Sequence, residues 1–238
     1  MTVLIEPGPN PWGELTRPFK RGDRAWPVLS AQIALNRFGN RLALDGDFGP
    51  ATEKVARAFQ VHRGMRVDGV IGPVSQERIC IDLSTSAARR YQLPVGLARG
   101  LIENESSFAL AAFTEHPSDT GFDLGAWQDS YASPGSQDEY RASLDVSVMA
   151  YRTCEKLRLR YDAYRSAGAP SRLAWECAAL YHNWPAAADR MAKGLAPLRS
   201  GSDEEAAWVV AASGGRLRTP REWADAYIAA ATKRVLEW

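Results

Sequence analysis

The chain is organised around the stretch from Leu101 to Gln128, which reads LIENESSF at residues 101–108 and SDTGFDLGAWQ at residues 118–128. Apolar residues in its first half, and just before it, recur at the i, i+3, i+4 spacing of an amphipathic helix. The positions on this stripe are Ala98, Leu101, Ile102, Glu105 and Phe108. The spacing predicts a helix that buries one side and carries Glu105 on that side.

Two carboxyl groups of this helix are predicted to differ in their surroundings. Glu105 lies on the apolar stripe, whereas Glu103 falls on the opposite, solvated face. Packing against apolar neighbours disfavours the ionised form of a carboxyl group, which then keeps a proton that it can donate near neutral pH. Glu105 is therefore a candidate general acid. The alternative is a structural carboxylate near a helix end, because single shielded carboxylates are often structural.

Length and composition describe a folded globular protein of two domains. In 238 residues each domain can bury a core, and 45% hydrophobic and 24% charged residues are ordinary values. The net charge of +1 leaves no basic excess for binding many phosphates, so we expect no nucleic-acid partner. Neither a membrane-spanning segment nor a secretory signal is visible, so we expect no membrane partner and no self-export. We expect a monomer.

Cysteine and histidine content argues against thiol and metal chemistry. Cys80, Cys154 and Cys177 are far apart and odd in number, which indicates no disulfide framework and a reducing compartment. Cys154 and Cys177 fit apolar positions in the middle of helices, so a Cys–His peptidase is disfavoured. Three histidines are too few for a zinc amidase. We therefore predict no metal and no cofactor.

The N-terminal third divides into an arm and a repeat. Residues 1–25 are rich in Pro, Gly and charge and predict an irregular arm. Two D-G-x-x-G-P segments, Asp45–Pro50 and Asp68–Pro73, then lie 23 residues apart, each after a predicted helix. Asp-Gly and Gly-Pro are turn dipeptides, and proline favours the first turn of a following helix. The alternative is that both segments only form turns and have no binding role.

The segments VLxxQxxLN and DGDFGPAT, followed by Phe59-Gln60 and DGVIGP, resemble the helical peptidoglycan-binding domain of many cell-wall hydrolases. The resemblance covers residues 26–83 and implies a small three-helix module that binds peptidoglycan. It places the ligand groove near the two turns, at Asp45, Phe48, Asp68 and Ile71. The small, polar residues 84–90 predict a linker to a second domain at residues 91–238.

Helical periodicity continues through the second domain. It predicts one long helix from Glu139 to about Tyr164 and another from about Leu173 to Trp184, stopped by Pro185. The predicted fold class is therefore mainly α.

The motifs of the second domain resemble those of lytic transglycosylases and goose-type lysozymes. The segment ESSF at residues 105–108 resembles their ES-G-F signature, and GAWQ at residues 125–128 resembles their G-L-M-Q. Asp119 precedes Gln128 by the nine residues of the goose-type pattern, and ALYHN at residues 179–183 resembles the A-Y-N-A-G segment that completes the cleft. The chain departs from the goose type at Ser130, where those enzymes carry a second Asp.

The resemblance implies a helical lysozyme-like domain in which Glu105 and Asp119 are catalytic. The substrate-binding residues that it implies are Asp123, Gly125, Gln128, Tyr181 and Asn183. In an inverting hydrolase the acid protonates the bridging oxygen while a second carboxylate, here Asp119, activates a water. In a lytic transglycosylase the C6 hydroxyl of muramic acid attacks instead. Asp119 favours hydrolysis; its alternative role is an Asx turn ahead of Gly121.

Together these resemblances imply a phage endolysin that cleaves the MurNAc–GlcNAc β-1,4 bond of peptidoglycan. Such a protein is made in the host cytoplasm and reaches the wall through a holin-type pore. The alternative from another class is a wall-binding or virion protein whose lysozyme-like domain is catalytically inactive.

Overall fold

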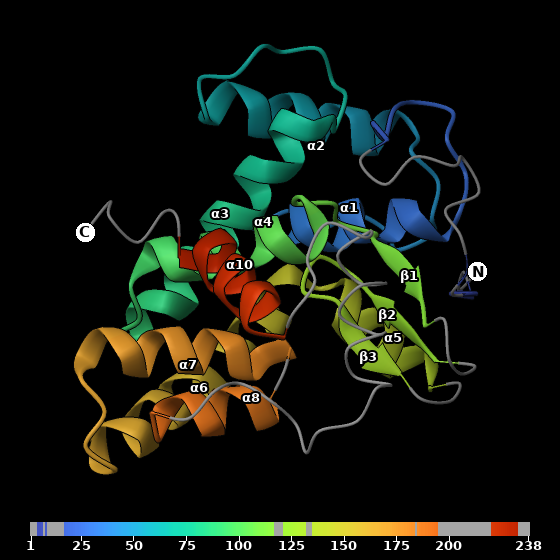
Figure 1. Cartoon of the computed structure of the whole chain (residues 1–238). Coiled ribbons are helices and arrows are strands. Elements are labelled where there is room, and N and C mark those ends of the chain that lie inside the picture. Colours follow the sequence, from blue (N-terminus) through green and yellow to red (C-terminus); the bar gives the residue numbers. More distant parts are fainter. Residues whose placement is uncertain are drawn as a thin grey trace. The chain divides into compact units, whose positions relative to one another are not determined.

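The computed structural model describes residues 4–6, 8, 17–116, 121–131, 135–183, 185–194 and 220–232. The fold is mainly helical, as predicted, with one small antiparallel sheet that the sequence did not lead us to expect (Figure 1). The helices are α1 (Trp26–Asn36), α2 (Pro50–His62), α3 (Pro73–Arg90), α4 (Val95–Ser106), α5 (Gln137–Leu144), α6 (Val146–Ser166), α7 (Ser171–Asn183), α8 (Pro185–Ala192) and α10 (Pro220–Thr232). The strands are β1 (Phe113–Glu115), β2 (Phe122–Leu124) and β3 (Asp129–Tyr131). None of the described helices is long and apolar enough to cross a membrane.

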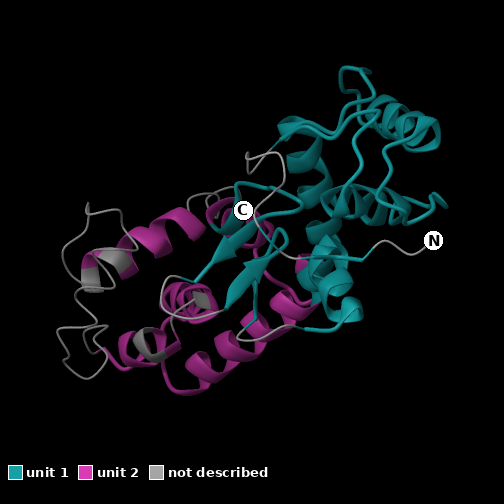
Figure 2. Ribbon diagram, turned by 90° about the vertical axis from the view of Figure 1, so that its right-hand side faces the viewer, with its two compact units in different colours: residues 1–87, 105–151 teal, residues 88–104, 152–238 magenta. Residues whose placement is uncertain are grey.

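The chain divides into two compact units, drawn in teal and magenta in Figure 2. Unit 1 contains residues 1–87 and 105–151, and unit 2 contains residues 88–104 and 152–238. The region predicted as one catalytic domain, residues 91–238, is therefore divided between the units. Its part with the Glu105 and Gln128 motifs clusters with the N-terminal residues.

The segment predicted as a linker, residues 84–90, is helical and forms the last turns of α3. The hydroxyl groups of Ser84 and Thr85 donate to the carbonyl oxygens one turn back, at Cys80 (2.6 Å) and Ile81 (2.7 Å). These bonds satisfy the two hydroxyls inside the helix, and the alanines and arginines that follow are good helix formers. Small polar composition is therefore compatible with helix here.

Helix α1 is the centre of unit 1. All ten residues from Trp26 to Leu35 are buried, and Pro27 stands in its first turn, where proline costs no hydrogen bond. A helix that is buried on every side must be surrounded by other elements. Helices α2 and α5 both pack against it.

The N-terminal arm belongs to unit 1 and pairs with both repeat turns. Phe19 forms an antiparallel bridge with Ile71, and Arg24 forms one with Asp47. Each of the two D-G-x-x-G-P turns therefore pairs with the arm through backbone hydrogen bonds. Phe19 is buried at 2% exposure, so the arm contributes to the core as well as to the pairing.

The predicted long helix from Glu139 to Tyr164 is instead two helices, which break at Asp145. The Asp145 carboxylate accepts hydrogen bonds from the backbone N–H of Ser147 (3.1 Å) and Val148 (3.3 Å), which caps the start of α6. Arg37, at the end of α1, binds the same carboxylate through Nε and Nη2. The break therefore has a local cause, the cap, and a distant one, the ion pair.

The sheet turns one aromatic face towards α5. Phe122 in the middle strand lies with its ring centroid 5.4 Å from that of Phe113 and 5.1 Å from that of Tyr131. Tyr140 of α5 covers this cluster, with centroid distances of 6.0 Å to Phe122 and 5.2 Å to Tyr131. The aromatic contacts fix which face of the sheet packs inward and leave the other face accessible.

In unit 2, small residues let helix backbones approach closely. A Cβ atom on Gly100 of α4 would lie 2.0 Å from the carbonyl oxygen of Ala231 in α10, so only glycine fits there. Helix α7 packs against both α8 and α10. Pro185 does end α7 as predicted, but it also begins α8, because proline is well tolerated at a first helical position.

Candidate functional site

Glu105 is the penultimate residue of α4. Its side chain is partly exposed, and so is that of Glu103. The prediction of one shielded and one solvated carboxylate is therefore wrong in this respect: exposure does not distinguish the two. The neighbours Leu101 and Ile102 are fully buried, as the stripe predicts. Because Glu105 stands where the helix ends, its side chain is at the edge of this buried stripe.

The chain turns sharply directly after α4. Ser107 and Phe108 have φ angles of 51° and 65°, in the left-handed region of the backbone that residues other than glycine rarely adopt. The bulky Phe108 is the less favourable of the two, yet it is buried at 6% exposure. Its carbonyl oxygen accepts from the thiol of Cys80 at 3.6 Å. Surrounding contacts therefore hold this turn in a conformation that costs on the order of 1–3 kcal/mol per strained residue.

The Gly125–Gln128 turn is the second strained segment. Gly125 has a φ of +81°, and a Cβ atom on it would lie 2.1 Å from the carbonyl oxygen of Ser143. Gln128 has a φ of 50°. The Ser106 hydroxyl donates to the carbonyl oxygen of Ala126 at 2.8 Å, which joins the end of α4 to this turn. The structure thus brings the ESSF and GAWQ motifs together.

Gln128 is held at both ends of its amide. Its Oε1 accepts from the Thr114 hydroxyl at 2.7 Å, and its Nε2 donates to the carbonyl oxygen of Gly125 at 2.9 Å. Trp127, which stands where the goose type has Met, is 1% exposed and fills the core. Of this motif, Gln128 is the residue whose side chain is partly exposed. Gly125, predicted to bind substrate, has a sufficient structural reason to be glycine.

Asp123 lies in the middle strand on the accessible face of the sheet. It stands opposite Thr114 of β1 and Ser130 of β3. Its Oδ1 is 2.9 Å from Nε2 of His116 and also accepts from the Ser130 hydroxyl. Asp119, the predicted catalytic partner of Glu105, lies outside the described residues. Sequence reasoning included Asp123 but missed His116 and Ser130 as its partners.

Tyr181 belongs to unit 2, near the end of α7. The guanidinium of Arg160 lies over its ring, with Cζ 3.8 Å from the ring centroid. One face of the ring is therefore occupied by a cation–π contact. Asn183 is the last residue of α7, and its side chain lies outside the described residues.

The two turns of the repeat are built alike, each around a buried glutamine. Gln32 donates to Oδ1 of Asp45 (2.7 Å) and to the carbonyl oxygen of Asp47 (3.0 Å), and it accepts from the N–H of Gly46 (3.0 Å). In the second turn, Gln60 donates to Oδ1 of Asp68 (2.8 Å) and to the carbonyl oxygen of Val70 (2.9 Å), and it accepts from the N–H of Gly69 (2.8 Å). The predicted internal repeat is therefore also a repeat of hydrogen bonding.

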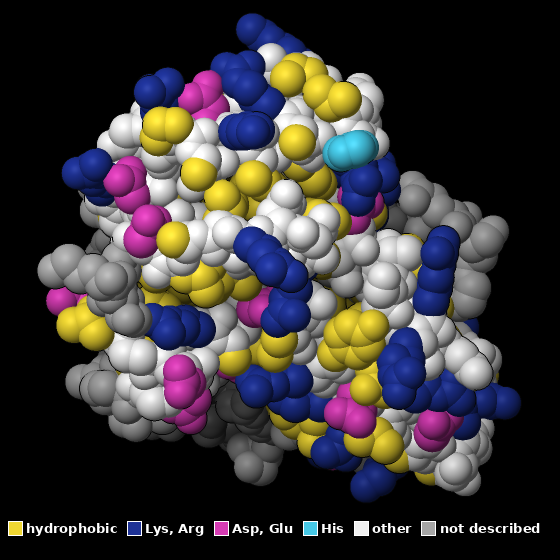
Figure 3. All heavy atoms as spheres, turned by 180° about the vertical axis from the view of Figure 1, so that it is seen from behind, with side chains coloured by type: hydrophobic (Ala, Val, Ile, Leu, Met, Phe, Trp, Pro, Cys, Tyr) yellow, Lys and Arg dark blue, Asp and Glu magenta, His cyan; other side chains and the backbone are white. Residues whose placement is uncertain are grey.

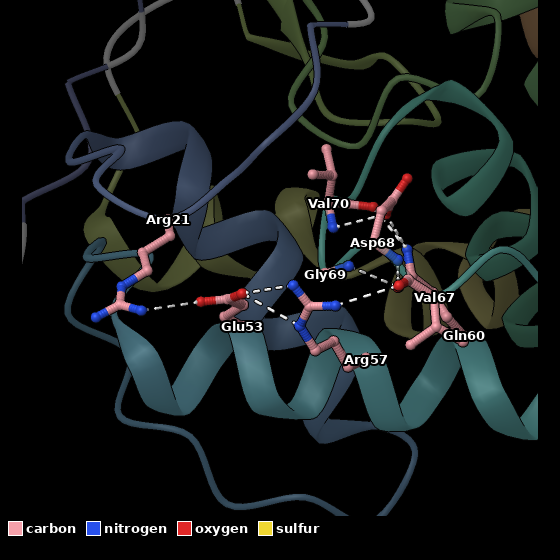
Figure 4. Close-up of polar contacts among 8 residues, drawn as sticks. All are labelled: Arg21, Glu53, Arg57, Gln60, Val67, Asp68, Gly69 and Val70. Carbon is pink, nitrogen blue, oxygen red and sulfur yellow. Dashed lines mark hydrogen bonds and ion pairs between the residues drawn. The ribbon is translucent and has the colours of Figure 1, made fainter.

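Figure 4 shows the second turn beside α2. Arg57 donates to Glu53 through Nε and Nη2 and to the carbonyl oxygen of Val67 through Nη1 at 3.2 Å. Arg21, from the N-terminal arm, approaches the same carboxylate at 3.5 Å. These hydrogen bonds lower the pKa of Glu53, with the bond to Arg57 as the largest cause. A Cβ atom on Gly69 would come within 2.9 Å of Nε of Arg57.

The four residues predicted to line the ligand groove have structural tasks. Phe48 and Ile71 are fully buried and belong to the core, so their side chains cannot contact a polymer at the surface. Asp45 and Asp68 are exposed, but each holds its own turn. The pKa of Asp45 is lowered mainly by the hydrogen bond from Gln32, and that of Asp68 mainly by the backbone N–H of Val70 and then by Gln60.

Thiol chemistry has no support among the described residues. Cys80, Cys154 and Cys177 are buried and unbonded to each other. Burial raises the pKa of Cys154 and of Cys177 to about 12, and it raises that of Cys80 further. All three are therefore protonated near neutral pH and fill the core.

On the face shown in Figure 3, basic side chains are interspersed with acidic and apolar ones.

Residues 27–77 match the family model of a putative peptidoglycan binding domain. This match confirms the predicted resemblance over α1, α2 and the beginning of α3. No curated protein matches the chain. Among solved structures, the chain is similar to the crystal structure of the Burkholderia AP3 phage endolysin, at 18% identity, over 93% of this chain and 100% of that chain, with a TM-score of 0.27. A TM-score this low is no basis for inferring a shared architecture or activity.

Proposed function

We propose that this protein is a peptidoglycan hydrolase that cleaves the MurNAc–GlcNAc β-1,4 glycosidic bond, with Glu105 as the general acid. The observation that carries the proposal is the junction at the end of α4. Glu105 lies two residues before the pair Ser107 and Phe108, which both have positive φ, and Ser106 donates a hydrogen bond to the turn that contains Gln128, a third such residue. Strained backbone of this kind clusters at functional sites. The match to a peptidoglycan-binding family supports the wall as the target.

The position of Glu105 suits proton donation to a large ligand. A partly exposed carboxyl group at the end of a helix can be reached by a polymer. Glu105 protonates the bridging oxygen as positive charge develops at the anomeric carbon. In the hydrolase, a second carboxylate, for which Asp119 is the sequence-based candidate, activates the attacking water. In a lytic transglycosylase the C6 hydroxyl attacks and no second carboxylate is needed.

We further propose that the protein acts as a phage endolysin. In this role it is made in the host cytoplasm, passes a holin-type pore and degrades the wall as a monomer. The combination of a wall-binding module with the Glu105 motif supports this proposal. The competing function is that of a wall-binding or virion protein without activity, which the module alone would also fit.

Replacing Glu105 by glutamine tests the proposal. Glu105→Gln fills the same volume but cannot donate the acid proton, so we expect lysis of purified walls to fall by on the order of 10²–10⁴. Binding to sedimented walls and the melting temperature should not change. Glu103→Gln, two residues away on the same helix with similar exposure, is the matched control and should keep its activity. Retained lysis in Glu105→Gln would refute the proposal, and an inactive wild type that still binds walls would favour the binding protein.

A further inference from the structure

The accessible face of the sheet carries a group of polar side chains. Thr114, Asp123 and Ser130 stand opposite one another on three adjacent strands, and His116 follows two residues after Thr114. The strand that holds Asp123 is paired on both edges, and the aromatic residues on the opposite face already hold the sheet against α5. Neither the strand pairing nor the aromatic packing therefore accounts for the polar groups on this face.

The contacts of Asp123 fix its carboxylate without burying it. Oδ1 accepts both hydrogen bonds, one from His116, the residue after β1, and one from Ser130 on β3. Oδ2 takes no hydrogen bond from any residue that the structure describes. The side chain of Asp123 is 23% exposed and that of His116 is 27% exposed, so a solvent molecule can reach the pair. The partly exposed carboxylate is thus anchored through Oδ1 alone among the described contacts.

A short series of contacts leads from this face to the end of α4. Thr114, opposite Asp123, donates to Gln128, whose amide donates to the carbonyl oxygen of Gly125. The carbonyl oxygen of Ala126, the next residue in that turn, accepts from the hydroxyl of Ser106, the neighbour of Glu105. All of these residues belong to unit 1. Asp123 and Glu105 therefore stand on two segments that the same turn connects.

We propose that Asp123 is the second catalytic carboxylate, that it holds the attacking water, and that His116 and Ser130 position it. The inference rests on the proposed glycosidase function of Glu105. In the reaction, Oδ2 of Asp123 accepts a proton from water as the water oxygen bonds to the anomeric carbon. The glycosidic C–O bond breaks with its electron pair going to the bridging oxygen, which takes the proton of Glu105. Exchange with solvent then restores both carboxyl groups, so the net reaction is hydrolysis.

Products made in heavy-oxygen water test the water step in the full-length protein. Mass spectrometry of digested walls should show reducing muramic acid ends that carry one heavy oxygen. Anhydro products, without the label, would overturn the role of Asp123 as a base. They would leave the role of Glu105 intact, because a lytic transglycosylase still needs an acid. Retained lysis in Glu105→Gln is the separate result that would remove the glycosidase function itself.

Substitution of the carboxylates tests the assignment. Asp123→Asn should lower kcat by on the order of 10²–10⁴, with wall binding and melting temperature unchanged. The matched control is Asp129→Asn, on the opposite face of the same sheet, where the carboxylate accepts from the Ser143 hydroxyl at 2.7 Å. That control should retain activity. A larger loss in Asp119→Asn than in Asp123→Asn would assign the base to Asp119 and overturn the proposal.

The role of His116 as a positioning residue has its own test. His116→Gln keeps a side-chain N–H donor and should retain most of kcat, whereas His116→Phe should lower kcat by on the order of 10-fold to 100-fold with KM unchanged. If His116 were merely structural, both substitutions would lower the melting temperature. The kcat values of the two variants would then not depend on whether the new side chain has an N–H donor. Should Asp123→Asn fail to fold, this pair decides: equal kcat values in the two variants would overturn the proposal.

Discussion

Asp45 and Asp68 in the repeat turns and Asp123 in the sheet are all carboxylates anchored through Oδ1, yet they differ in what the anchoring does. In each turn, Oδ1 accepts from the backbone N–H two residues ahead, at Asp47 (3.0 Å) and Val70 (2.9 Å). The carboxylate thereby replaces a backbone acceptor where the chain reverses. In the sheet, the strands already pair, and both donors to Asp123 are side chains.

This difference separates carboxylates that serve the fold from one that is available for chemistry. Removing a turn carboxylate leaves backbone groups without their acceptor, which costs stability. Removing the Asp123 carboxylate leaves two side-chain donors that water can reach, so little stability is lost. The same comparison applies to the motif residues: Gly125 serves the fold, whereas Glu105 lies beside the strained turn with its side chain partly exposed.

The largest effect on stability is expected at Gly125. Gly125→Ala places a Cβ atom 2.1 Å from the carbonyl oxygen of Ser143 and strains a φ of +81°, so we expect the free energy of unfolding to fall by on the order of 3 kcal/mol. Lysis should be lost with it. Denaturant unfolding measures the loss of stability, and a lysis assay on purified walls measures the loss of activity. Gly168→Ala is the control, because Gly168 has a φ of +92° with no atom within 4 Å, and it should cost about 1 kcal/mol. Equal losses in the two variants would mean that the close approach to Ser143 does not matter.

The sequence predicted most of the helices and both turns, because their signals are local. Proline after glycine marks the starts of α2 and α3, and the apolar stripe before Glu105 marks α4. The sheet was missed because each of its strands has three residues, too few for the alternation of apolar and polar positions to stand out. The faint signal lay in Phe-Thr-Glu-His at residues 113–116, where the first position packs inward and the second and fourth face outward.

What the sequence did not reveal depends on contacts between distant residues. The carboxylate of Asp145, where the helix breaks, is bound by Arg37, which lies 108 positions away. Burial of Phe48 and Ile71 follows from the pairing of the N-terminal arm with both turns, which no local pattern records. For the same reason the region that carries Glu105 was assigned wholly to a second domain, whereas it clusters with residues 1–87. The partners of Asp123 require the strand register, so His116 and Ser130 could not be named.

An intermediate effect is expected at the glutamines that hold the turns. Gln60→Leu removes the donors to Asp68 and Val70 and leaves the buried N–H of Gly69 without its acceptor, so we expect the free energy of unfolding to fall by about 1–3 kcal/mol. Val61→Leu, at a 61% exposed position of the same helix, is the control and should be neutral within about 0.5 kcal/mol. Urea unfolding measures both. If the specific activity of folded Gln60→Leu fell as well, the turns would not be purely structural and the comparison with Asp123 would weaken.

The smallest effect is expected from acid acting on the two turn carboxylates. The pKa of Asp45 and that of Asp68 lie below the ordinary value of 3.8, so the folded state binds their protons less tightly than the unfolded state does. Their contribution to stability is therefore complete above about pH 4 and is lost as the pH falls below 3.8 through the lowered values. Because both side chains are exposed, solvent screening keeps the contribution small.

The double substitution Asp45→Asn/Asp68→Asn isolates this contribution from that of the other carboxylates. An asparagine at each position keeps an oxygen acceptor but cannot take up the proton, so the difference in urea midpoint between pH 5 and pH 3 should be smaller in the variant than in the wild type. If the difference in the double variant were as large as in the wild type, the fold would not use the charge of the two turn carboxylates, and the distinction between the turns and the sheet would fail.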